Sequence, residues 1–310
     1  MKRAVPAWLM LAPFLIFFAV FLFGPLLYAM YISLYGERFG TQFFVGLTNY
    51  IDAFQDPNFW PAVGRVLFFG VVEVTCMIVL ALAFALLLDG PLARFKTLFR
   101  LVYFLPYAVP AVVATIMWGF LYSTTMDSQF LNFLGGGAAH PFNPTGTGTL
   151  LYAIVNIVLW EFVGYNMTLY YAALTGIPLD LYDGAKIDGA NEWRMAWNIK
   201  LPMIRPMVIM TVVLSIVGAL QLFNEPFFLS QLVPISLDYT PNSEIYYSAF
   251  TFENIPYAAT LSMILGFICI ALAVTFMLIV RRAGRRQIGF REEGIPEDRA
   301  GRDTVAMGGM

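Results

Sequence analysis

Long stretches without a single charged residue constrain this chain more than any other feature. The first of them runs from Ala4 to Gly36 and contains no Asp, Glu, Lys or Arg. An apolar run of about 18 residues or more is typical of a membrane-spanning helix. Lipid offers no hydrogen-bond partners to backbone N–H and C=O groups. A spanning segment that does not pair with strands of a barrel must therefore be helical. This first run is also too long for the core of a signal peptide.

Six such stretches predict an all-α membrane protein with six transmembrane helices. Only 12% of the residues are charged, whereas soluble domains carry roughly 25%. Pro106 and Pro110 should kink or break the third span. We expect the spans at residues 7–35, 62–88, 101–123, 149–174, 206–228 and 256–280.

The basic residues predict which side of the membrane each loop faces. Of the 18 lysines and arginines, all but Arg38 and Arg65 fall in the N-terminus, in 89–100, in 175–205 or after residue 280. Positive charge gathers on the cytoplasmic side, so both termini should be cytoplasmic. The chain then divides into a first helix with an external loop (1–61), a core permease domain with a cytoplasmic loop at 175–206 (62–280), and a cytoplasmic tail (281–310). We expect disorder in the tail.

The loop between the fourth and fifth spans is charged where its flanks are apolar. Residues 177–206, called the insert below, read IPLDLYDGAKIDGANEWRMAWNIKLPMIRP. Pro178 can begin a helix and Gly189 can end it. Asn191 can cap a second helix, with Glu192 in its first turn. The insert therefore predicts two short helices joined by a turn.

An apolar stripe runs along the second of these helices. Trp193, Trp197 and Leu201 recur every four residues, Pro202 should end the helix, and Pro206 should open the fifth span. Pattern alone leaves two interpretations open. The insert could pack on the span ends and lipid headgroups of its own molecule. It could also be presented to a groove on a cytoplasmic partner.

The insert resembles the cytoplasmic Glu-Ala-Ala loop of permeases from binding-protein-dependent ABC importers. That loop reads roughly Ile-Pro-x-x-Leu-x-Glu-Ala-Ala-x-x-Asp-Gly-Ala, with Leu-Pro and a further Pro later on. The matching residues are Ile177, Pro178, Leu181, Ala185, Asp188, Gly189, Ala190, Leu201, Pro202 and Pro206. The insert departs from the pattern where Asp183-Gly184-Ala185 replaces Glu-Ala-Ala. Asp keeps the charge, whereas Gly costs a helix about 1 kcal/mol relative to Ala.

Other segments between residues 43 and 280, among them FVGLTNYIDAFQDPNFWPAV and VLWEFVGYNMTLYYAALTGIP, resemble carbohydrate permeases of the same superfamily. The resemblance implies a type I ABC importer permease fold in a bacterial-type inner membrane. It implies as partners a second permease subunit, two copies of an ATP-binding subunit, an extracytoplasmic solute-binding protein and membrane lipid. It also implies that the insert couples to the ATPase through Asp183, Gly184, Ala185, Asp188, Gly189, Ala190, Trp193, Trp197 and Pro202.

The sequence carries no motif for chemistry of its own. There is no Gly-x-x-x-x-Gly-Lys-Ser/Thr phosphate loop, so ATP and Mg²⁺ would bind the partner ATPase. Cys76 and Cys269 lie inside apolar runs, and His140 is the single histidine. These residues predict neither a disulfide framework nor a metal site. We expect no catalytic residue, no cofactor bound by this chain and no nucleic-acid partner.

Polar residues at membrane depth predict where a substrate would pass, because they are costly in lipid. Amides and carboxylates can pair sugar hydroxyls, and aromatic faces can cover sugar rings. Resemblance to maltose-type permeases implies sugar contacts in spans four and five. The corresponding residues here are Gly164, Tyr165, Asn166, Gln221, Asn224 and Glu225, and Trp160 joins them as an aromatic residue of the fourth span. Ordinary helix packing through small and polar residues is the competing interpretation.

The sequence thus predicts a permease subunit that forms half of an ATP-driven pathway for a sugar or oligosaccharide and is not itself an enzyme. One alternative is an ion-coupled secondary transporter in which Glu73, Glu161 and Glu225 form a proton path. Glu73 and Glu161 could instead be protonated or hydrogen-bonded to neighbouring spans. A further alternative is a membrane scaffold whose insert recruits a cytoplasmic protein without any solute flux.

Overall fold

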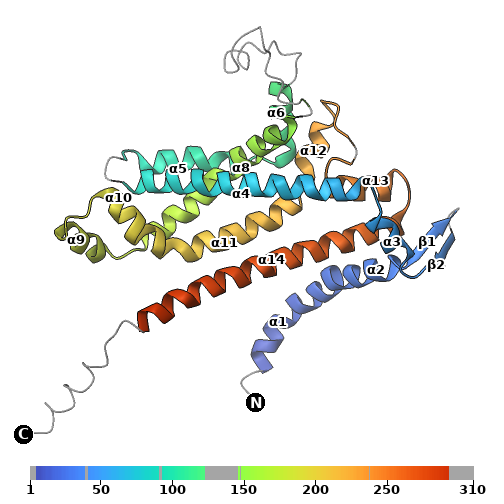
Figure 1. Cartoon of the computed structure of the whole chain (residues 1–310), viewed down its shortest axis with the longest axis horizontal. Helices are drawn as coiled ribbons and strands as arrows, with labels where there is room; N and C mark the ends of the chain where they lie inside the picture. The colour runs from blue at the N-terminus through green and yellow to red at the C-terminus, as the bar shows by residue number, and fades with distance from the viewer. Residues whose placement is uncertain are drawn as a thin grey trace, which may run out of the picture.

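Figure 1 shows the computed structural model of the chain, an elongated bundle of helices with the insert at one end. It describes residues 5–38, 41–90, 93–122, 146, 148–236 and 238–292. For residues 5–9, 38 and 281–292 only the backbone is described. His140 and most of the loop around it lie outside these ranges.

Within the described ranges, five helical stretches are long and apolar enough to cross a membrane. The first combines α1 (Val5–Phe18), a π-helical turn η1 (Ala19–Phe23) and α2 (Gly24–Ile32). The second and third are α4 (Phe59–Asp89) and α8 (Leu150–Thr175). The fourth runs through Glu192–Leu220, and the fifth is the beginning of α14 (Ile255–Glu292). These confirm predicted spans one, two, four and six and the helical core of span five.

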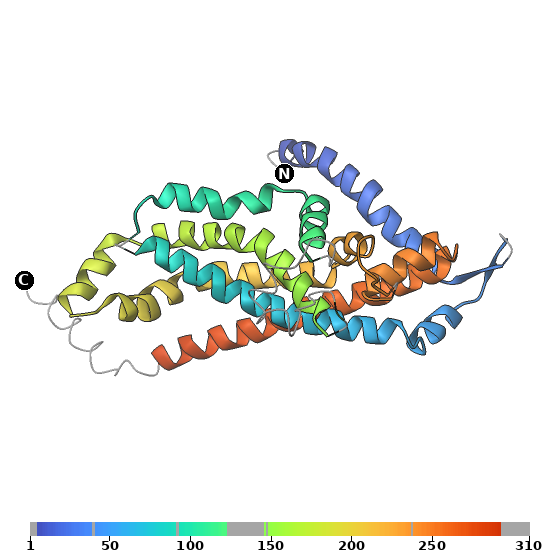
Figure 2. The same cartoon turned by 90° about the horizontal axis from the view of Figure 1, so that it is seen from above.

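The third predicted span is broken rather than straight. α5 (Lys96–Phe104) continues into a 3₁₀ turn, η2 (Leu105–Ala108), and α6 (Ala111–Tyr122) leaves this pair at an angle of 95°. Figure 2 shows α6 lying across the direction of α5. Pro106 lies in the 3₁₀ turn and Pro110 at the break, where proline cannot donate a helical hydrogen bond. Counted as one span, this bent pair completes the six.

The last helix extends past the predicted end of the sixth span. α14 continues from Val280 to Glu292, so the polar tail predicted at 281–310 begins as helix. Its residues there include several Arg, Gln and Glu, which are good helix formers. Residues 293–310 lie outside the described ranges.

The centre of the bundle is the pair α4 and α8, which contact each other more extensively than any other two elements. Towards the insert, Ala81 and Ala85 of α4 pack with Met167 and Tyr170 of α8. The small alanines let the two helices approach closely. α11 (Leu201–Leu220) packs beside them, and the Tyr170 hydroxyl lies 2.5 Å from that of Thr211.

The first and last spans carry wide apolar surfaces that the described chain does not cover. We compare the share of buried residues in the most apolar 18-residue window of each helix. This share is 0% in Met10–Ile32 and 11% in Ile255–Val280, whereas it is 56% in α8. In Figure 1 both helices lie at the lower margin of the bundle. Such surfaces require lipid or another membrane subunit as their neighbour.

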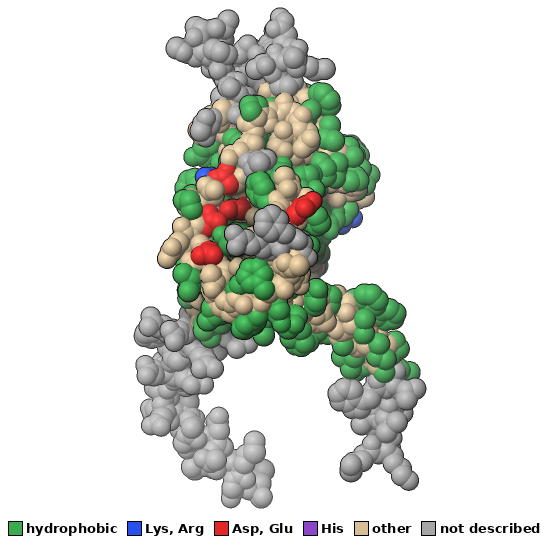
Figure 3. Space-filling model, turned by 90° about the vertical axis from the view of Figure 1, so that its right-hand side faces the viewer, with side chains coloured by type: hydrophobic (Ala, Val, Ile, Leu, Met, Phe, Trp, Pro, Cys, Tyr) green, Lys and Arg blue, Asp and Glu red, His purple; other side chains and the backbone are tan. Residues whose placement is uncertain are grey.

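The end opposite the insert is built from short elements. β1 (Tyr35–Arg38) and β2 (Thr41–Phe44) form an antiparallel hairpin, which the sequence analysis did not predict. α3 (Thr48–Phe54) and α13 (Pro241–Phe250) pack against α14 beside it. Figure 3, a view onto this end, shows acidic side chains gathered on it.

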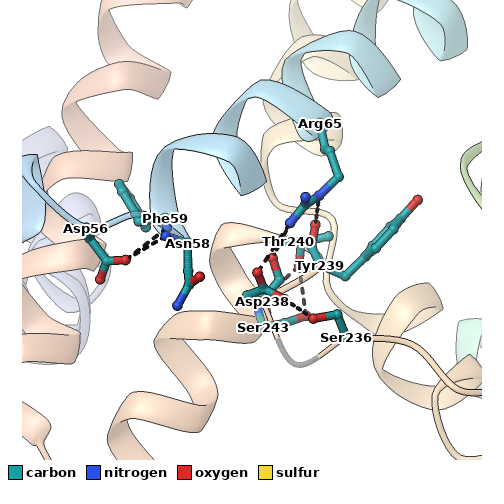
Figure 4. Close-up of polar contacts among 9 residues, drawn as sticks. All are labelled: Asp56, Asn58, Phe59, Arg65, Ser236, Asp238, Tyr239, Thr240 and Ser243. Carbon is teal, nitrogen blue, oxygen red and sulfur yellow. Dashed lines mark hydrogen bonds and ion pairs between the residues drawn. The ribbon is translucent and has the colours of Figure 1, made fainter. Parts of the chain in front are cut away.

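Arg65 ties this extracytoplasmic end together. Its Nε donates to the carbonyl of Tyr239 at 3.0 Å and its Nη2 to that of Asp238 at 2.6 Å, as Figure 4 shows. The Asp238 carboxylate lies 3.8 Å from the same Nη2. Asp56 accepts from the backbone N–H of Asn58 at 2.8 Å at the start of α4. One of the two basic residues outside the cytoplasmic set thus has a structural role.

Candidate functional site

The first part of the insert is a short helix closed by a glycine turn. α9 (Leu179–Ile187) is followed by Gly189 in the left-handed conformation, with φ +75°. The N–H of Ala190 bonds the carbonyl of Ala185 at 2.9 Å, and that of Gly189 bonds Lys186 at 3.0 Å. This pair of bonds is the Schellman motif, which satisfies the last carbonyls of a helix. The predicted turn at Gly189 is confirmed.

The second helix of the insert is not separate from the fifth span. Asn191 caps it as predicted, its Oδ1 accepting from the N–H of Arg194 at 2.9 Å. From there α10 (Glu192–Met195), a π turn η3 (Ala196–Lys200) and α11 run on without interruption. The predicted helix end at Pro202 and restart at Pro206 are therefore wrong. The wider π turn before Pro202 makes room for a ring that would otherwise collide with the preceding turn.

Two tryptophans of the insert face outward. Trp193 and Trp197 are 70% and 56% exposed, and their rings meet edge to face at 5.8 Å. Leu201, predicted to continue this stripe, packs instead against the buried core around Ile204. A π turn takes more residues per turn than an α-helix, so Trp197 and Leu201, four residues apart, no longer share a face. The outward surface is an aromatic pair rather than a longer stripe.

Lys200 fixes the insert to the second span. Its side chain is 7% exposed, and its Nζ lies 2.6 Å from Oδ2 of Asp89 at the end of α4. The same Nζ lies 3.6 Å from Oε2 of Glu192 and 5.5 Å from the ring centre of Tyr182. Burial, together with the charges of Asp89 and Glu192, raises the pKa of Tyr182. In the sequence, Lys200 is one of the basic residues that predict topology, and no pattern there indicates its pairing with Asp89.

The other residues predicted to contact the ATPase differ in how far they are exposed. Asp183, Gly184, Asp188 and Pro202 are exposed, whereas Ala185 and Ala190 are half-buried. The ion pair between Lys186 and Asp183, at 3.7 Å, is exposed and contributes little stability. A Cβ on Gly184 would meet nothing within 4 Å. The departure from Ala at this position therefore has no steric cause in the described chain.

A cavity of about 270 Å³ lies between α4, α8, α11 and the short helix α12 (Asn224–Leu229). Its volume is near the lower end of the roughly 300–1,000 Å³ typical of ligand pockets. Five of the seven predicted pathway residues line it, and they share a polar or aromatic side chain. They are Tyr165, Asn166, Gln221, Asn224 and Glu225.

A break in the fifth span brings these side chains into the cavity. α11 ends at Leu220, and α12 begins only at Asn224, so the predicted continuous span 206–228 is interrupted. Asn242 of α13 donates through Nδ2 to the carbonyls of Leu220 at 2.9 Å and Leu222 at 3.3 Å. Irregular backbone at membrane depth is tolerated where protein or a cavity surrounds it. Gln221 and Asn224 stand on either side of this break.

The other two pathway candidates lie elsewhere. Trp160 meets Trp118 of α6 edge to face, with ring centres 6.1 Å apart. Gly164 lies against the backbone of Tyr103, and a Cβ there would collide with the Tyr103 carbonyl. Its lack of a side chain lets α8 and α5 pack closely. Neither residue lines the cavity.

The three membrane-depth acids are all buried, and two of them line the cavity. Glu73, Glu161 and Glu225 are 3%, 3% and 8% exposed. Glu73 and Glu225 line the cavity, and Glu161 interacts electrostatically with Glu225. In the described residues, Oε2 of Glu73 and Oε1 of Glu161 have no hydrogen-bond partner. The same part of the chain contains no group of three residues suited to hold a metal ion.

Comparison with known proteins places this geometry in a family. Residues 77–288 match the family described as binding-protein-dependent transport system inner membrane component. The lactose transport system permease protein LacF of Rhizobium radiobacter is 32% identical, over 84% of this chain and 89% of its own. The arabinooligosaccharides transport system permease protein AraP of Bacillus subtilis is 28% identical, over 94% of this chain and 91% of its own.

Solved structures share the fold. A bacterial ABC transporter involved in the import of the acidic polysaccharide alginate has a chain with a TM-score of 0.78 and 19% identity, covering 91% of this chain and 96% of its own. A second structure, of a bacterial alginate ABC transporter in complex with alginate pentasaccharide-bound periplasmic protein, gives a TM-score of 0.79 at 20% identity, with the same coverage. The predicted type I importer permease fold is confirmed.

These matches give no support to the ion-coupled alternative, since the family is one of binding-protein-dependent transport. Permeases of this family work with a partner permease, an ATPase and a solute-binding protein. The chain belongs to the binding-protein-dependent transport system inner membrane components and is a multi-pass inner-membrane permease of an ABC importer.

Proposed function

We propose that this chain forms half of the pathway through which an ATP-driven importer moves a sugar or oligosaccharide. The cavity beside the break in the fifth span carries this proposal, because it gathers amide, carboxyl and aromatic groups. Amides and carboxyls can pair hydroxyls, and the Tyr165 ring can cover the apolar face of a sugar. Its relatives include lactose and arabinooligosaccharide permeases, which supports the same substrate class.

The insert is the proposed contact with the ATPase. Trp193 and Trp197 offer an exposed aromatic anchor with charged edges, which suits a helix docked in a groove. The remaining contact surface would be formed by Asp183, Gly184, Ala185, Asp188, Gly189, Ala190 and Pro202. ATP and Mg²⁺ would bind two copies of the ATPase, while this chain would carry no catalytic residue, cofactor or metal and would not be an enzyme.

The other partners are assigned to the remaining surfaces. The solute-binding protein would dock on the acidic extracytoplasmic end, and the exposed first and last spans would contact the second permease and lipid. No nucleic acid is expected as a partner. ATP binding would move the insert, and the Lys200–Asp89 contact would pass that motion to α4, which lines the cavity.

Reconstitution tests this function. The permease, its partner permease and the ATPase are placed in proteoliposomes with the binding protein, and uptake of labelled neutral oligosaccharides is measured. We expect uptake that requires ATP inside and stops when the catalytic residue of the ATPase is replaced. Uptake by this chain alone, driven by a proton gradient, would contradict the proposal, and so would a complex that hydrolyses ATP without moving any solute.

A further inference from the structure

The cavity carries acids but no bases. Glu73 and Glu225 line it, and neither is more than 8% exposed. Glu161 is close enough to Glu225 for their charges to interact. None of the lining residues in the described chain is Lys, Arg or His. Depending on protonation, the two lining carboxyls make this site neutral or negative, and in no state positive.

Two of these acids differ from ordinary buried acids because one oxygen of each lacks a hydrogen-bond partner in the described residues. One carboxyl oxygen of Glu73 and one of Glu161 make no hydrogen bond within the described residues. A buried polar atom without a partner is costly, so such atoms are uncommon unless they serve a ligand. Glu73 stands directly in the cavity wall. Its unpaired oxygen is buried within that wall, so Glu73 places an ionisable group without a basic partner beside the bound solute.

We propose that the cavity accepts uncharged saccharides and excludes saccharides that carry a carboxylate, with Glu73 and Glu225 as the residues that determine this specificity. The inference rests on the proposed sugar transport. A hydroxyl can donate to an ionised Glu and accept from a protonated one. The carboxylate of a uronic acid would lose its water shell and meet no positive charge, and it would be repelled by any ionised Glu.

This proposal separates the chain from the structures whose fold it shares. Those structures belong to importers of alginate, an acidic polysaccharide. At 19% and 20% identity the shared fold does not fix the preference for charge, which depends on side chains in the site.

Frontal affinity chromatography on the immobilised permease complex tests the charge preference. The complex contains both permeases and the ATPase but no binding protein, so that only the membrane site selects. The probe is a mixed pool of di- and trisaccharides from gluco, galacto and manno series, each present as the neutral sugar and as its C6 uronic acid. Mass spectrometry identifies which members are retained. We expect the best-retained neutral sugar to bind at least about tenfold more tightly than its uronic acid.

Isosteric variants assign the effect to residues. Glu73→Gln and Glu225→Gln keep the shape and remove the charge, so each should reduce the ratio of neutral to acidic binding by about threefold or more. Glu244→Gln, a carboxyl outside the cavity, is the matched control and should leave the ratio unchanged. Thermal unfolding of each complex verifies that the variants are folded.

The outcomes are distinguishable. Equal or stronger retention of uronic acids by the wild-type complex would overturn this inference and leave the proposed sugar transport in place. A preference for neutral sugars that both glutamine variants retain would remove Glu73 and Glu225 as its cause. If no saccharide is retained, neutral or acidic, the proposed substrate class fails and this inference fails with it.

Discussion

Two regions of this molecule bury charge in opposite ways. At the base of the insert, Lys200 is 7% exposed and forms a 2.6 Å ion pair with Asp89, with Glu192 close by. In the membrane cavity, Glu73 and Glu161 are just as buried, yet one oxygen of each has no partner. A buried ion pair is strongly destabilised when one partner is removed, whereas an unpaired acid adapts by binding a proton or a ligand.

The difference corresponds to what each region has to do. In the proposed function the insert would move as one body with α4, and a buried, directional ion pair would hold the two elements in a fixed register. The cavity would accept and release a solute, so its polar groups would not be fully paired inside the protein. On that proposal, charge pairing belongs to the part of the molecule that transmits motion, and unpaired polarity belongs to the part that meets the solute.

The largest effect is expected at the glycine turn of the insert. Gly189→Val places a β-branched side chain at φ +75°, which strains the backbone by about 1–3 kcal/mol and misplaces both tryptophans. We expect normal membrane insertion but loss of ATPase co-purification and of substrate-stimulated hydrolysis. Gly184→Ala is the matched control, because a Cβ there meets nothing within 4 Å. If Gly189→Val keeps both the co-purification and the stimulated hydrolysis, the insert is a helix packed at the membrane surface and not the contact with the ATPase.

Breaking the ion pair tests whether the insert and α4 move together. Lys200→Met leaves Asp89 buried without its partner and should cost about 3–5 kcal/mol of stability. We expect hydrolysis to continue while transport per ATP falls about tenfold, since the ATPase contact itself is intact. The double variant Lys200→Met/Asp89→Asn should recover much of the loss. Equal transport per ATP in wild type and Lys200→Met would show that α4 does not receive motion through this contact.

The next effect tests the outward face of the insert. Trp197→Ala removes an aromatic side chain that is 56% exposed in this chain, and truncating an interface anchor costs about 2 kcal/mol or more. Binding of the ATPase should weaken about thirtyfold or more without loss of folding. Phe250→Ala, an exposed aromatic at the opposite end, is the control and should bind normally. If the two variants bind equally well, Trp197 faces lipid rather than the ATPase.

The sequence was sufficient for the features that depend on composition and local pattern. Apolar runs predicted the spans, because the hydrocarbon thickness sets their length. The Asn191 cap and the Gly189 turn followed from local backbone chemistry. Pro106 and Pro110 predicted the break in the third span, although not its angle. Five of the seven pathway candidates proved to line one cavity.

What the sequence could not supply depends on contacts between distant segments. The pairing of Lys200 with Asp89 joins residues on two different spans, and no periodicity reveals it. Leu201 was placed on the wrong face because a π turn, with more residues per turn than an α-helix, shifts the helix after it. Gly164 looked like part of a polar pathway, and only the structure shows the backbone of Tyr103 against it.

The polar side of the cavity is tested by removing its amides. Asn224→Leu or Gln221→Leu takes away groups that can pair a sugar hydroxyl, and each lost hydrogen bond is worth about 0.5–1.5 kcal/mol. We expect uptake of a neutral oligosaccharide to require about threefold to tenfold more substrate, with assembly and basal hydrolysis unchanged. Trp160→Phe, outside the cavity, serves as the control. Unchanged kinetics in both leucine variants would assign these amides to helix packing.

The smallest effect concerns Glu244 at the extracytoplasmic end. This acid has both acidic and basic neighbours, so it stands between the paired Lys200 and the acids of the cavity. Burial and the nearby charges of Asp56 and Asp238 raise the pKa of Glu244 from 4.5 to about 7, and Arg65 only partly opposes this. The folded protein therefore holds this proton more firmly than the unfolded chain. The resulting stability is fully present below pH 4.5 and is lost as the pH rises through about 7.

Thermal unfolding in nanodiscs should show a larger drop in Tm between pH 5 and pH 8 for wild type than for Glu244→Gln. Asp52→Asn, an exposed carboxyl on the same end, should behave like wild type. An identical drop in wild type and Glu244→Gln would mean that Glu244 is already ionised at pH 5, and the extracytoplasmic acids would then resemble ordinary surface charges rather than those of the cavity.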